Sequence, residues 1–166
     1  AIEPGDLAVH RQGVELGELV GRCFGTWTAQ AAAQGVELIL VKGPPISLDG
    51  DADTLTELFD RLLSNAVGCT PAEERIEMKL SATDTQAVID LTNSGTYLAP
   101  DELEQIFEPF FRGSNVPPTD GSRADVGLGI AKAIAEAHGG AVRVGSVHGI
   151  ATQFCVTLPL VEPGNG

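Results

Sequence analysis

Apolar residues recur at three- and four-residue spacing in two long stretches of the chain, which is the period of a helix with one buried face. The first stretch covers residues 16–31 and ends at Gly35. The second covers residues 55–67 and has the cleanest apolar stripe, and Thr54 and Glu57 have the spacing of a capping box at its start. The pattern therefore predicts two amphipathic helices.

Shorter apolar segments predict strands. One continuous apolar run looks like a buried strand, and two alternating segments joined by a short polar turn look like a hairpin with one buried face. Residues 49–51 (DGD) are expected to form a polar turn before the second helix. The five predicted strands cover residues 36–41, 75–81, 86–92, 141–146 and 153–160.

A short helix near residues 101–106 and a third main helix over residues 131–138 complete the expected elements. Helices and strands interleave unequally, which favours a mixed sheet with helices on one face. We therefore predict an α/β fold, a two-layer α/β sandwich whose mixed, mostly antiparallel sheet of about five strands is covered on one face by three main helices. The length fits a single domain, residues 1–166, with frayed ends at residues 1–6 and 161–166.

Charge and composition narrow the function classes. The formal net charge is −13 and the chain has only 10 Lys and Arg residues, which argues against a nucleic-acid partner because such binding depends on neutralising phosphates. An anionic ligand would need local help from backbone amides or a metal ion. No apolar run approaches the roughly 20 residues that cross a bilayer, and no signal peptide opens the chain. We expect a soluble domain without direct membrane contact.

The three cysteines carry no metal-site pattern. Cys23, Cys69 and Cys155 are widely separated and lack metal-ligand spacing. Reduced, buried thiols in a cytoplasmic setting are therefore expected.

Asn65 is a polar residue at an unexpected place on the second helix. On a helical wheel it lies only about 20° from Leu58, so it borders the buried stripe, and Arg61 lies one turn earlier on the same side. An amide oxygen there could ligate Mg2+, a cation that accepts carbonyl ligands while it keeps phosphates and waters. An ordinary hydrogen-bonded asparagine near a helix end would show the same pattern. The helix alone leaves both interpretations open.

A glycine-rich helix start follows an irregular segment later in the chain. Residues 107–112 (FEPFFR) are followed by Asn115, two prolines and then residues 127–132 (GLGIAK), which open a helix that stops at residues 138–140 (HGG). This order is typical of a mobile lid in front of a nucleotide triphosphate site. The HGG triplet is well explained as an ordinary helix C-terminus.

Four signals follow one another in order: Asn65, residues 93–95 (NSG), the lid with residues 127–129 (GLG), and residues 149–152 (GIAT). In this order they resemble the catalytic ATP-binding domain of sensor histidine kinases, in the larger superfamily shared with gyrase, Hsp90 and MutL. The resemblance spans about residues 7–159. Its firmest pieces are residues 62–66 with 70–71, residues 106–112 and residues 130–140.

The resemblance implies ATP and Mg2+ as cofactors and a role for each matching residue. Asn65 would ligate the Mg2+ that bridges the ATP phosphates, and Asn93 and Thr152 would lie at the adenine. Residues 107–126 would close as the ATP lid, and Gly127 would give backbone access to the phosphates at a helix start, where N–H groups favour anions. The remaining implied nucleotide contacts are Gly95, Phe107, Phe110, Arg112, Leu128 and Gly129.

The chain departs from the family pattern around the nucleotide. Asn93 stands where the family usually has an adenine-binding Asp, and its amide both donates and accepts but carries no charge, which would weaken adenine selectivity. Several glycines, a basic residue and an aromatic residue of the family pattern are also replaced. One glycine next to the lid is replaced by Asp125, whose carboxylate would repel phosphate. These changes favour weak nucleotide affinity, or a lid that closes only in the full-length protein. The replaced positions are Tyr97, Asp125 and Ala151 for the glycines, and Gly68 and Cys69 for the basic and aromatic residues.

Arg61 bears on the reaction, because hydrolytic relatives have a Glu at this position, four residues before the metal-binding Asn, that activates water. A guanidinium cannot act as that base. Phosphotransfer to a histidine is therefore favoured over hydrolysis, with Asn65 and Arg61 as catalytic residues. None of His10, His138 and His148 stands in the family's phosphoacceptor pattern, so each is expected to be structural or solvent-facing and the acceptor to lie outside this chain.

Together these inferences predict the ATP-binding catalytic domain of a two-component sensor histidine kinase, which transfers the γ-phosphoryl group to a histidine on a separate dimerisation and phosphoacceptor domain. A cognate response regulator would be its downstream partner. The domain would be cytoplasmic, with the parent protein anchored in the cell membrane. Two alternatives stay open: a degenerate, non-catalytic nucleotide-sensing or scaffolding module of the same fold, and an anti-sigma-factor serine kinase.

Overall fold

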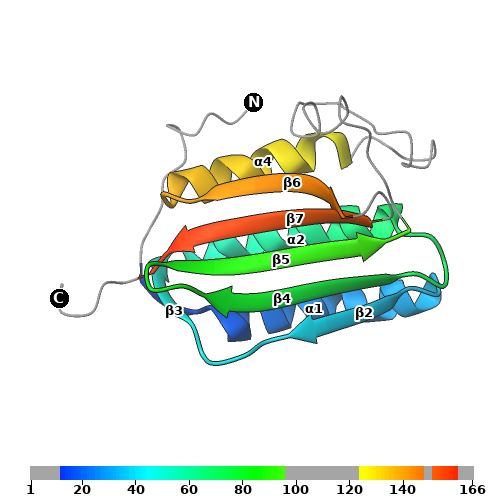
Figure 1. Cartoon of the computed structure of the whole chain (residues 1–166), viewed down its shortest axis with the longest axis horizontal. Helices are drawn as coiled ribbons and strands as arrows, with labels where there is room; N and C mark the ends of the chain where they lie inside the picture. Colours follow the sequence, from blue (N-terminus) through cyan, green and yellow to red (C-terminus); the bar gives the residue numbers. More distant parts are fainter. Residues whose placement is uncertain (1–11, 96–123, 148–150, 161–166) are drawn as a thin grey trace.

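The computed structural model describes residues 12–95, 124–147 and 151–160, which form two layers (Figure 1). A five-stranded sheet makes one layer, and three helices cover one of its faces. The expected short helix near residues 101–106, and the expected lid up to residue 123, lie outside the described residues. The predicted two-layer α/β sandwich is confirmed.

The main sheet has the strand order β2-β4-β5-β7-β6. Only β2 (Glu37–Val41) and β4 (Arg75–Ala82) run parallel to each other. β4 and β5 (Gln86–Ser94) form the predicted hairpin, and β6 (Ala141–Val147) and β7 (Ala151–Pro159) form a second antiparallel pair. β5 and β7 are also antiparallel, so the predicted mixed, mostly antiparallel sheet of five strands is confirmed.

Two features of the first third of the chain differ from the sequence-based expectation. β2, expected as a buried strand, is an edge strand whose residues are exposed or half-buried. Residues 49–51, expected as a turn, begin inside β3 (Ser47–Gly50), which pairs with β1 (Gln12–Glu15) in a separate two-stranded sheet. The reason is local, because Leu48 is buried and Asp49 is exposed, as the alternation of a strand requires.

Three described helices pack on the sheet: α1 (Leu16–Ala33), α2 (Ala52–Cys69) and α4 (Ala124–Ala137). The apolar stripe predicted for α2 is buried, but the helix is capped by Asp51 rather than by Thr54. Oδ1 of Asp51 accepts hydrogen bonds from two backbone N–H groups at 3.0 and 3.2 Å. Aspartate is among the strongest N-cap residues, so α2 begins earlier than the capping-box spacing implies. Within the described ranges, no helix combines the length and the apolar character needed to cross a membrane.

α4 begins earlier than the sequence predicts. Its first residue is Ala124, so residues 124–126, which the family resemblance assigns to the lid, belong to the helix. The lid boundary at residue 126 came from the family resemblance, and Gly127 and Gly129, which each lower helix propensity by about 1 kcal/mol relative to alanine, gave no signal that the helix extends further back. Leu128 is only 2% exposed and packs into the core, and such tertiary packing outweighs weak propensity.

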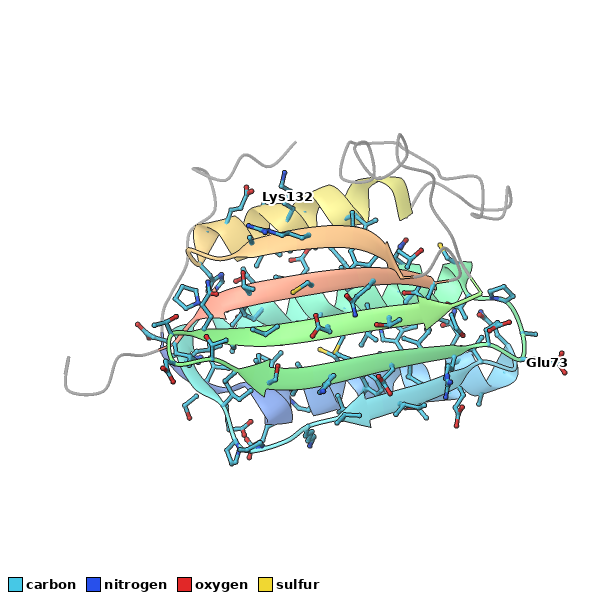
Figure 2. The ribbon with its side chains drawn as sticks, in the orientation of Figure 1. Glu73 and Lys132 are labelled. Carbon is cyan, nitrogen blue, oxygen red and sulfur yellow. The ribbon has the colours of Figure 1, made fainter. Side chains whose placement is uncertain are left out.

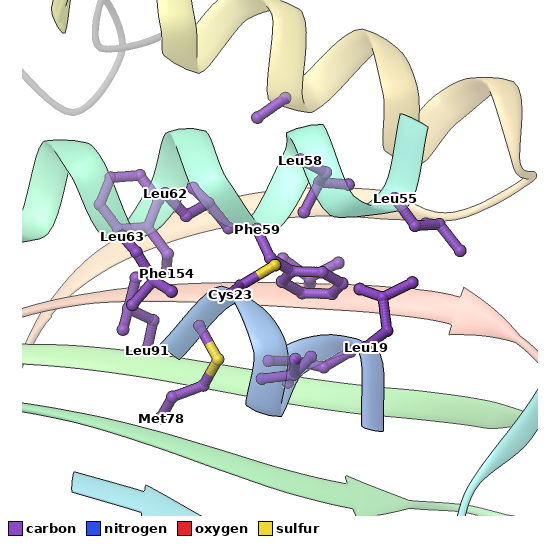
Figure 3. Packing of buried hydrophobic residues seen from close by; sticks show 14 of the residues in the cluster. Leu19, Cys23, Leu55, Leu58, Phe59, Leu62, Leu63, Met78, Leu91 and Phe154 are labelled. Carbon is purple, nitrogen blue, oxygen red and sulfur yellow. The ribbon is translucent and has the colours of Figure 1, made fainter. Parts of the chain in front are cut away.

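The hydrophobic core lies between the helices and the inward face of the sheet, with α2 at its centre (Figure 3). Leu62 and Leu63 of α2 lie close to Leu91 of β5 and Phe154 of β7 in this view. Burial alternates along β5 and β7, as it does in strands with one face turned to a core. The same faces of these three elements continue into Asn65, Asn93 and Thr152, so the core packing positions the candidate site.

A buried histidine joins the start of α2 to the end of α4, so these two helices run antiparallel. His138 is 3% exposed; its Nε2 accepts a hydrogen bond from the Asp51 N–H at 3.0 Å, and its Nδ1 donates to the Ile134 carbonyl oxygen at 2.9 Å. Gly139, with a φ of 82°, and Gly140, whose N–H bonds a carbonyl oxygen five residues earlier at 2.9 Å, end the helix. The structural role predicted for residues 138–140 is confirmed.

We call the group formed by Asp51, His138, Gly139 and Gly140 the histidine end of the molecule. It is a helix junction held by internal hydrogen bonds. The other two histidines, His10 and His148, lie outside the described residues.

Candidate functional site

Four elements begin or end on the side of the molecule opposite the histidine end (Figure 1). α2 ends at Cys69 where α4 begins at Ala124, because the two helices are antiparallel. β5 ends at Ser94 where β7 begins at Ala151, and these two residues are register partners. Candidate residues far apart in the sequence therefore collect at one end. We call it the asparagine end, made of Asn65, Asn93, Thr152 and the first turn of α4.

Asn93 and Thr152 lie directly opposite each other on β5 and β7. They are 2% and 3% exposed, and they continue the inward-facing rows that contain Leu91 and Phe154. Directly opposed residues of antiparallel strands have Cβ atoms about 4.5–5.5 Å apart. The two residues implied at the adenine thus form one polar patch at the end of an otherwise apolar sheet face.

The hydroxyl of Thr152 has an unusual environment for a buried polar group. Within the part of the chain that the structure describes, Oγ1 makes no hydrogen bond. A buried hydroxyl left in this condition costs about 1–3 kcal/mol, and proteins usually supply a partner for it. A ligand with a hydrogen-bonding edge, such as a nucleobase, would satisfy this atom. The environment of Thr152 therefore fits its implied role.

Asn65 lies near the C-terminal end of α2 and is half-buried. Its Oδ1 accepts a hydrogen bond from the Sγ of Cys69 at 3.7 Å. A carbonyl oxygen has two lone pairs, so one acceptor site remains for a metal ion. No group of three or more His, Cys, Asp or Glu side chains among the described residues could hold a metal, so an ion here would combine Asn65 with phosphate and water oxygens. The metal role of Asn65 stays a prediction.

The turn after α2 holds the helix end that carries Asn65. The Thr70 hydroxyl donates to the Ala66 carbonyl oxygen at 2.7 Å and closes the last turn. Glu73 has a φ of 74°, uncommon for a residue other than glycine. Its N–H donates to the Gly35 carbonyl oxygen at 2.8 Å, and its side chain projects from the edge of the molecule (Figure 2). These bonds tie the end of α2 to the connection between α1 and β2.

Arg61 is held by its own helix. Its Nη2 lies 2.7 Å from Glu57 Oε2 and its Nε donates to the same oxygen at 2.9 Å. The Arg61 side chain is 32% exposed, and ion pairs at such positions contribute little to stability. A catalytic contribution from Arg61 stays a prediction.

The first turn of α4 offers backbone donors. The N–H groups of its first three residues, Ala124 to Val126, have no intrahelical acceptor, and the helix dipole favours an anion there. A backbone contact from Gly127 stays a prediction. The Leu128 side chain belongs to the core and Gly129 is half-buried, so binding roles for these residues stay predictions. Three other implied contacts lie outside the described residues: Phe107, Phe110 and Arg112.

The end of β5 is tied to the start of β4 by a serine whose role the sequence did not reveal. The Ser94 hydroxyl donates to Glu74 Oε1 at 2.8 Å and accepts from the Arg75 N–H at 2.9 Å. Gly95 follows with a φ of 75°, a conformation that favours glycine, and a Cβ there would meet the Glu74 side chain. Glu74 lies 20 residues before Ser94, so no local pattern signals the contact. A nucleotide contact from Gly95 stays a prediction.

All three cysteines are free thiols, as expected, although only Cys23 is fully buried. Burial raises the pKa of Cys23, Cys69 and Cys155 to about 11 each. Asp60 adds to the effect at Cys23, and Asp90 adds to it at Cys155. The thiols are therefore protonated at neutral pH, which makes them poor nucleophiles but leaves them able to donate a hydrogen bond.

Comparison with known sequences identifies the family. The model of the histidine kinase-, DNA gyrase B-, and HSP90-like ATPases matches residues 50–162. Sensor histidine kinase CusS from Escherichia coli strain K12 is 34% identical over 153 residues, which make up 92% of this chain and 32% of CusS. The chain thus spans about a third of the length of this relative.

Two solved structures share the fold. The mycobacterial sensor histidine kinase MprB superposes with a TM-score of 0.80 at 25% identity, with 89% of this chain and 97% of that chain covered. Full-length ShkA in complex with AMPPNP superposes with a TM-score of 0.79 at 25% identity, with 92% of this chain and 32% of that chain covered. With its family match covering well over half of its residues, the chain belongs to the histidine kinase-, DNA gyrase B-, and HSP90-like ATPases.

Proposed function

We propose that this chain is the ATP-binding catalytic domain of a two-component sensor histidine kinase. It binds Mg-ATP at the asparagine end and, in its parent protein, donates the γ-phosphoryl group to a histidine on a separate dimerisation domain. The observation that carries the proposal is the buried pair Asn93 and Thr152, with a hydroxyl that makes no hydrogen bond among the described residues. Family membership and the AMPPNP complex of ShkA support a nucleotide as the ligand.

The two sheet residues hold the base in this proposal. The Thr152 hydroxyl can donate to or accept from the edge of the base, and the Asn93 amide lies beside it on the neighbouring strand. The amide accepts from an exocyclic amine through its oxygen. Because hydrogen bonds to a charged carboxylate are stronger, we expect weaker adenine binding than an Asp at this position would give.

Asn65 and the start of α4 hold the phosphates. Asn65 contributes Oδ1 as a ligand to Mg2+, which supplies charge neutralisation for phosphoryl transfer. The backbone N–H groups of residues 124–126 donate to phosphate oxygens. Local donors of this kind allow a chain with a net charge of −13 to bind an anion.

Arg61 favours transfer over hydrolysis. Its guanidinium, paired with Glu57, cannot take a proton from water, whereas phosphoryl transfer chiefly requires positioning and charge neutralisation. We therefore propose that the acceptor is a histidine of the dimerisation and phosphoacceptor domain and that a response regulator is the downstream partner. Because the chain spans a third of CusS, a longer parent protein, anchored in the membrane with this domain in the cytoplasm, fits the proposal.

Calorimetric titration of ATP with Mg2+ into the chain tests the proposal. The wild-type chain should release heat and bind, and Asn65→Ala should lose at least about tenfold in affinity, as expected when a metal site loses a ligand. Gln153→Ala is a matched control, because this amide follows Thr152 on β7 but donates to Thr92 Oγ1 at 3.1 Å on the outward sheet face. Its affinity should equal that of the wild type.

A non-catalytic nucleotide-sensing or scaffolding module is the second candidate. The replacements at Asn93, Tyr97 and Asp125 favour it, because they weaken contacts to base and phosphate. Two results separate the candidates. A folded chain that gives no heat at millimolar ATP refutes the kinase proposal, and phosphohistidine formed by the full-length protein but not by its Asn65→Ala variant refutes the module.

A further inference from the structure

Cys69 contacts the side chain of the proposed metal ligand, Asn65. Asn65 and Cys69 lie four residues apart in the last turns of α2, which places them on the same helix face. The Sγ of Cys69 donates to the Oδ1 of Asn65 at 3.7 Å. Cys23 makes a different contact, since its Sγ donates to the backbone carbonyl oxygen of Thr56 on the neighbouring helix. Among the described cysteines, only Cys69 reaches the side chain of a candidate metal ligand.

The geometry of this hydrogen bond gives its direction. The Sγ of Cys69 lies 3.7 Å from the Oδ1 of Asn65, which has no hydrogen to give, so the thiol is the donor and the amide oxygen is the acceptor. The thiol is also firmly placed, because Thr70, the next residue, closes the helix through its bonds to Ala66.

The orientation of the Asn65 amide decides whether this residue can bind a cation. The oxygen and nitrogen of an amide exchange places when the group rotates by about 180°. When Oδ1 faces the proposed cation site, the lone pair that does not accept from Cys69 is available to Mg2+. When Nδ2 faces the site instead, its two N–H groups repel the cation. A donor fixed beside Oδ1 therefore selects the orientation that binds metal.

We propose that Cys69 is a positioning residue for the metal ligand Asn65. Its thiol holds the amide with Oδ1 toward the cation site, so that Mg2+ binds with a smaller loss of side-chain freedom. The proposal rests on the proposed function of the asparagine end. Support for a ligand at that end comes independently from Thr152, whose buried hydroxyl makes no hydrogen bond among the described residues.

Nucleotide affinity with and without Mg2+ tests this role. Cys69→Ala should weaken ATP binding in the presence of Mg2+ about threefold, as expected for a single weak hydrogen bond, and should leave Mg2+-free binding unchanged. Cys69→Ser keeps a donor and should restore the wild-type affinity. Cys155→Ala, which removes a half-buried thiol from strand β7, should change the ATP affinity neither with nor without Mg2+. The proposal is refuted if Cys69→Ala binds ATP-Mg2+ as the wild type does, or weakens binding equally without Mg2+.

A double-mutant cycle separates this proposal from the proposed function. In an Asn65→Ala background, Cys69→Ala should have no further effect, because the side chain that it positions is gone. If the wild type itself shows no gain from Mg2+, the function proposed for Asn65 fails. If Asn65→Ala loses the gain while Cys69→Ala keeps it in full, the function stands and only the positioning role falls.

Discussion

The two ends of the α2–α4 helix pair both contain polar side chains and glycines. They differ in how many of the hydrogen-bonding groups at each end have a partner within the protein. At the histidine end, both ring nitrogens of His138 have hydrogen-bond partners. One partner is the Asp51 N–H at the start of α2, and the other is the Ile134 carbonyl oxygen in the last turn of α4. At the asparagine end, Thr152 Oγ1 makes no hydrogen bond among the described residues. The Asn65 Oδ1 accepts one hydrogen bond there, from Cys69, which leaves its second lone pair for a ligand. One helix junction can thus be completed for stability while the other retains binding capacity for a ligand.

Two glycines, one near each end, show a similar contrast. A Cβ on Gly140, at the histidine end, would collide with the backbone carbonyl of Thr157. A Cβ on Gly68, near the asparagine end, would meet no other described atom within 4 Å. Substitutions at the histidine end should therefore change the free energy of unfolding, and those at the asparagine end should change nucleotide affinity.

Gly140→Ala should have the largest effect. The added methyl group meets a backbone carbonyl that cannot rotate away, so we expect the free energy of unfolding to fall by about 3 kcal/mol or more. Urea denaturation measures the loss. Gly145→Ala in β6 is the control, because its Cβ would have open space around it. Equal stability of the two variants would show that the histidine end tolerates change.

His138→Ala should lower the free energy of unfolding by about 2–4 kcal/mol, because it opens a cavity and removes the acceptor of the Asp51 N–H. Thermal and urea denaturation measure this. The dissociation constant for ATP-Mg2+, measured under conditions where the variant is folded, should stay within about twofold of the wild type. The reason is that His138 lies at the end of the helix pair opposite the proposed nucleotide site. A variant of normal stability with impaired binding would contradict the division between the two ends.

Thr152→Val should act in opposite directions on stability and binding. It replaces a buried hydroxyl that makes no described hydrogen bond with a methyl group of similar size, so the ligand-free chain should gain about 1 kcal/mol in free energy of unfolding. ATP affinity should fall about fivefold, because the base loses a partner. Thr152→Ser keeps the hydroxyl and should retain the affinity. A loss of stability in Thr152→Val would mean that the hydroxyl is already satisfied within the protein.

Periodicity explains which parts of the fold could be predicted. The stripe of α2 and the hairpin of β4 and β5 carry their signal in adjacent residues, so they were found from the sequence. The pairing of β1 with β3, the edge position of β2 and the early start of α4 depend on contacts between distant segments. The Asp-Gly-Asp sequence of residues 49–51 predicted a turn, because local propensity does not include the pairing of β3 with a distant strand.

The candidate site shows the same limit. Helical geometry alone marked Asn65 as a polar residue at the rim of a buried stripe, and the structure places it there. The pairing of Asn93 with Thr152 spans much of the chain, and only the family resemblance brought these residues together before the sheet register was known. The contacts of Ser94 and Cys69 depend on side-chain orientation, which no spacing rule supplies.

Gly68→Lys should have the smallest effect. It tests whether the phosphates of ATP lie near the exposed C-terminal end of α2. This helix position is exposed and has space for a side chain, and the family resemblance places a basic residue near the nucleotide here. A lysine should tighten ATP-Mg2+ binding about threefold at low salt, and less as salt screens the charge. Gly68→Ala should raise the free energy of unfolding by up to about 1 kcal/mol through helix propensity and leave affinity unchanged. Gly68→Glu should weaken binding, so equal affinities for the Lys and Glu variants would mean that no phosphate lies near the end of α2.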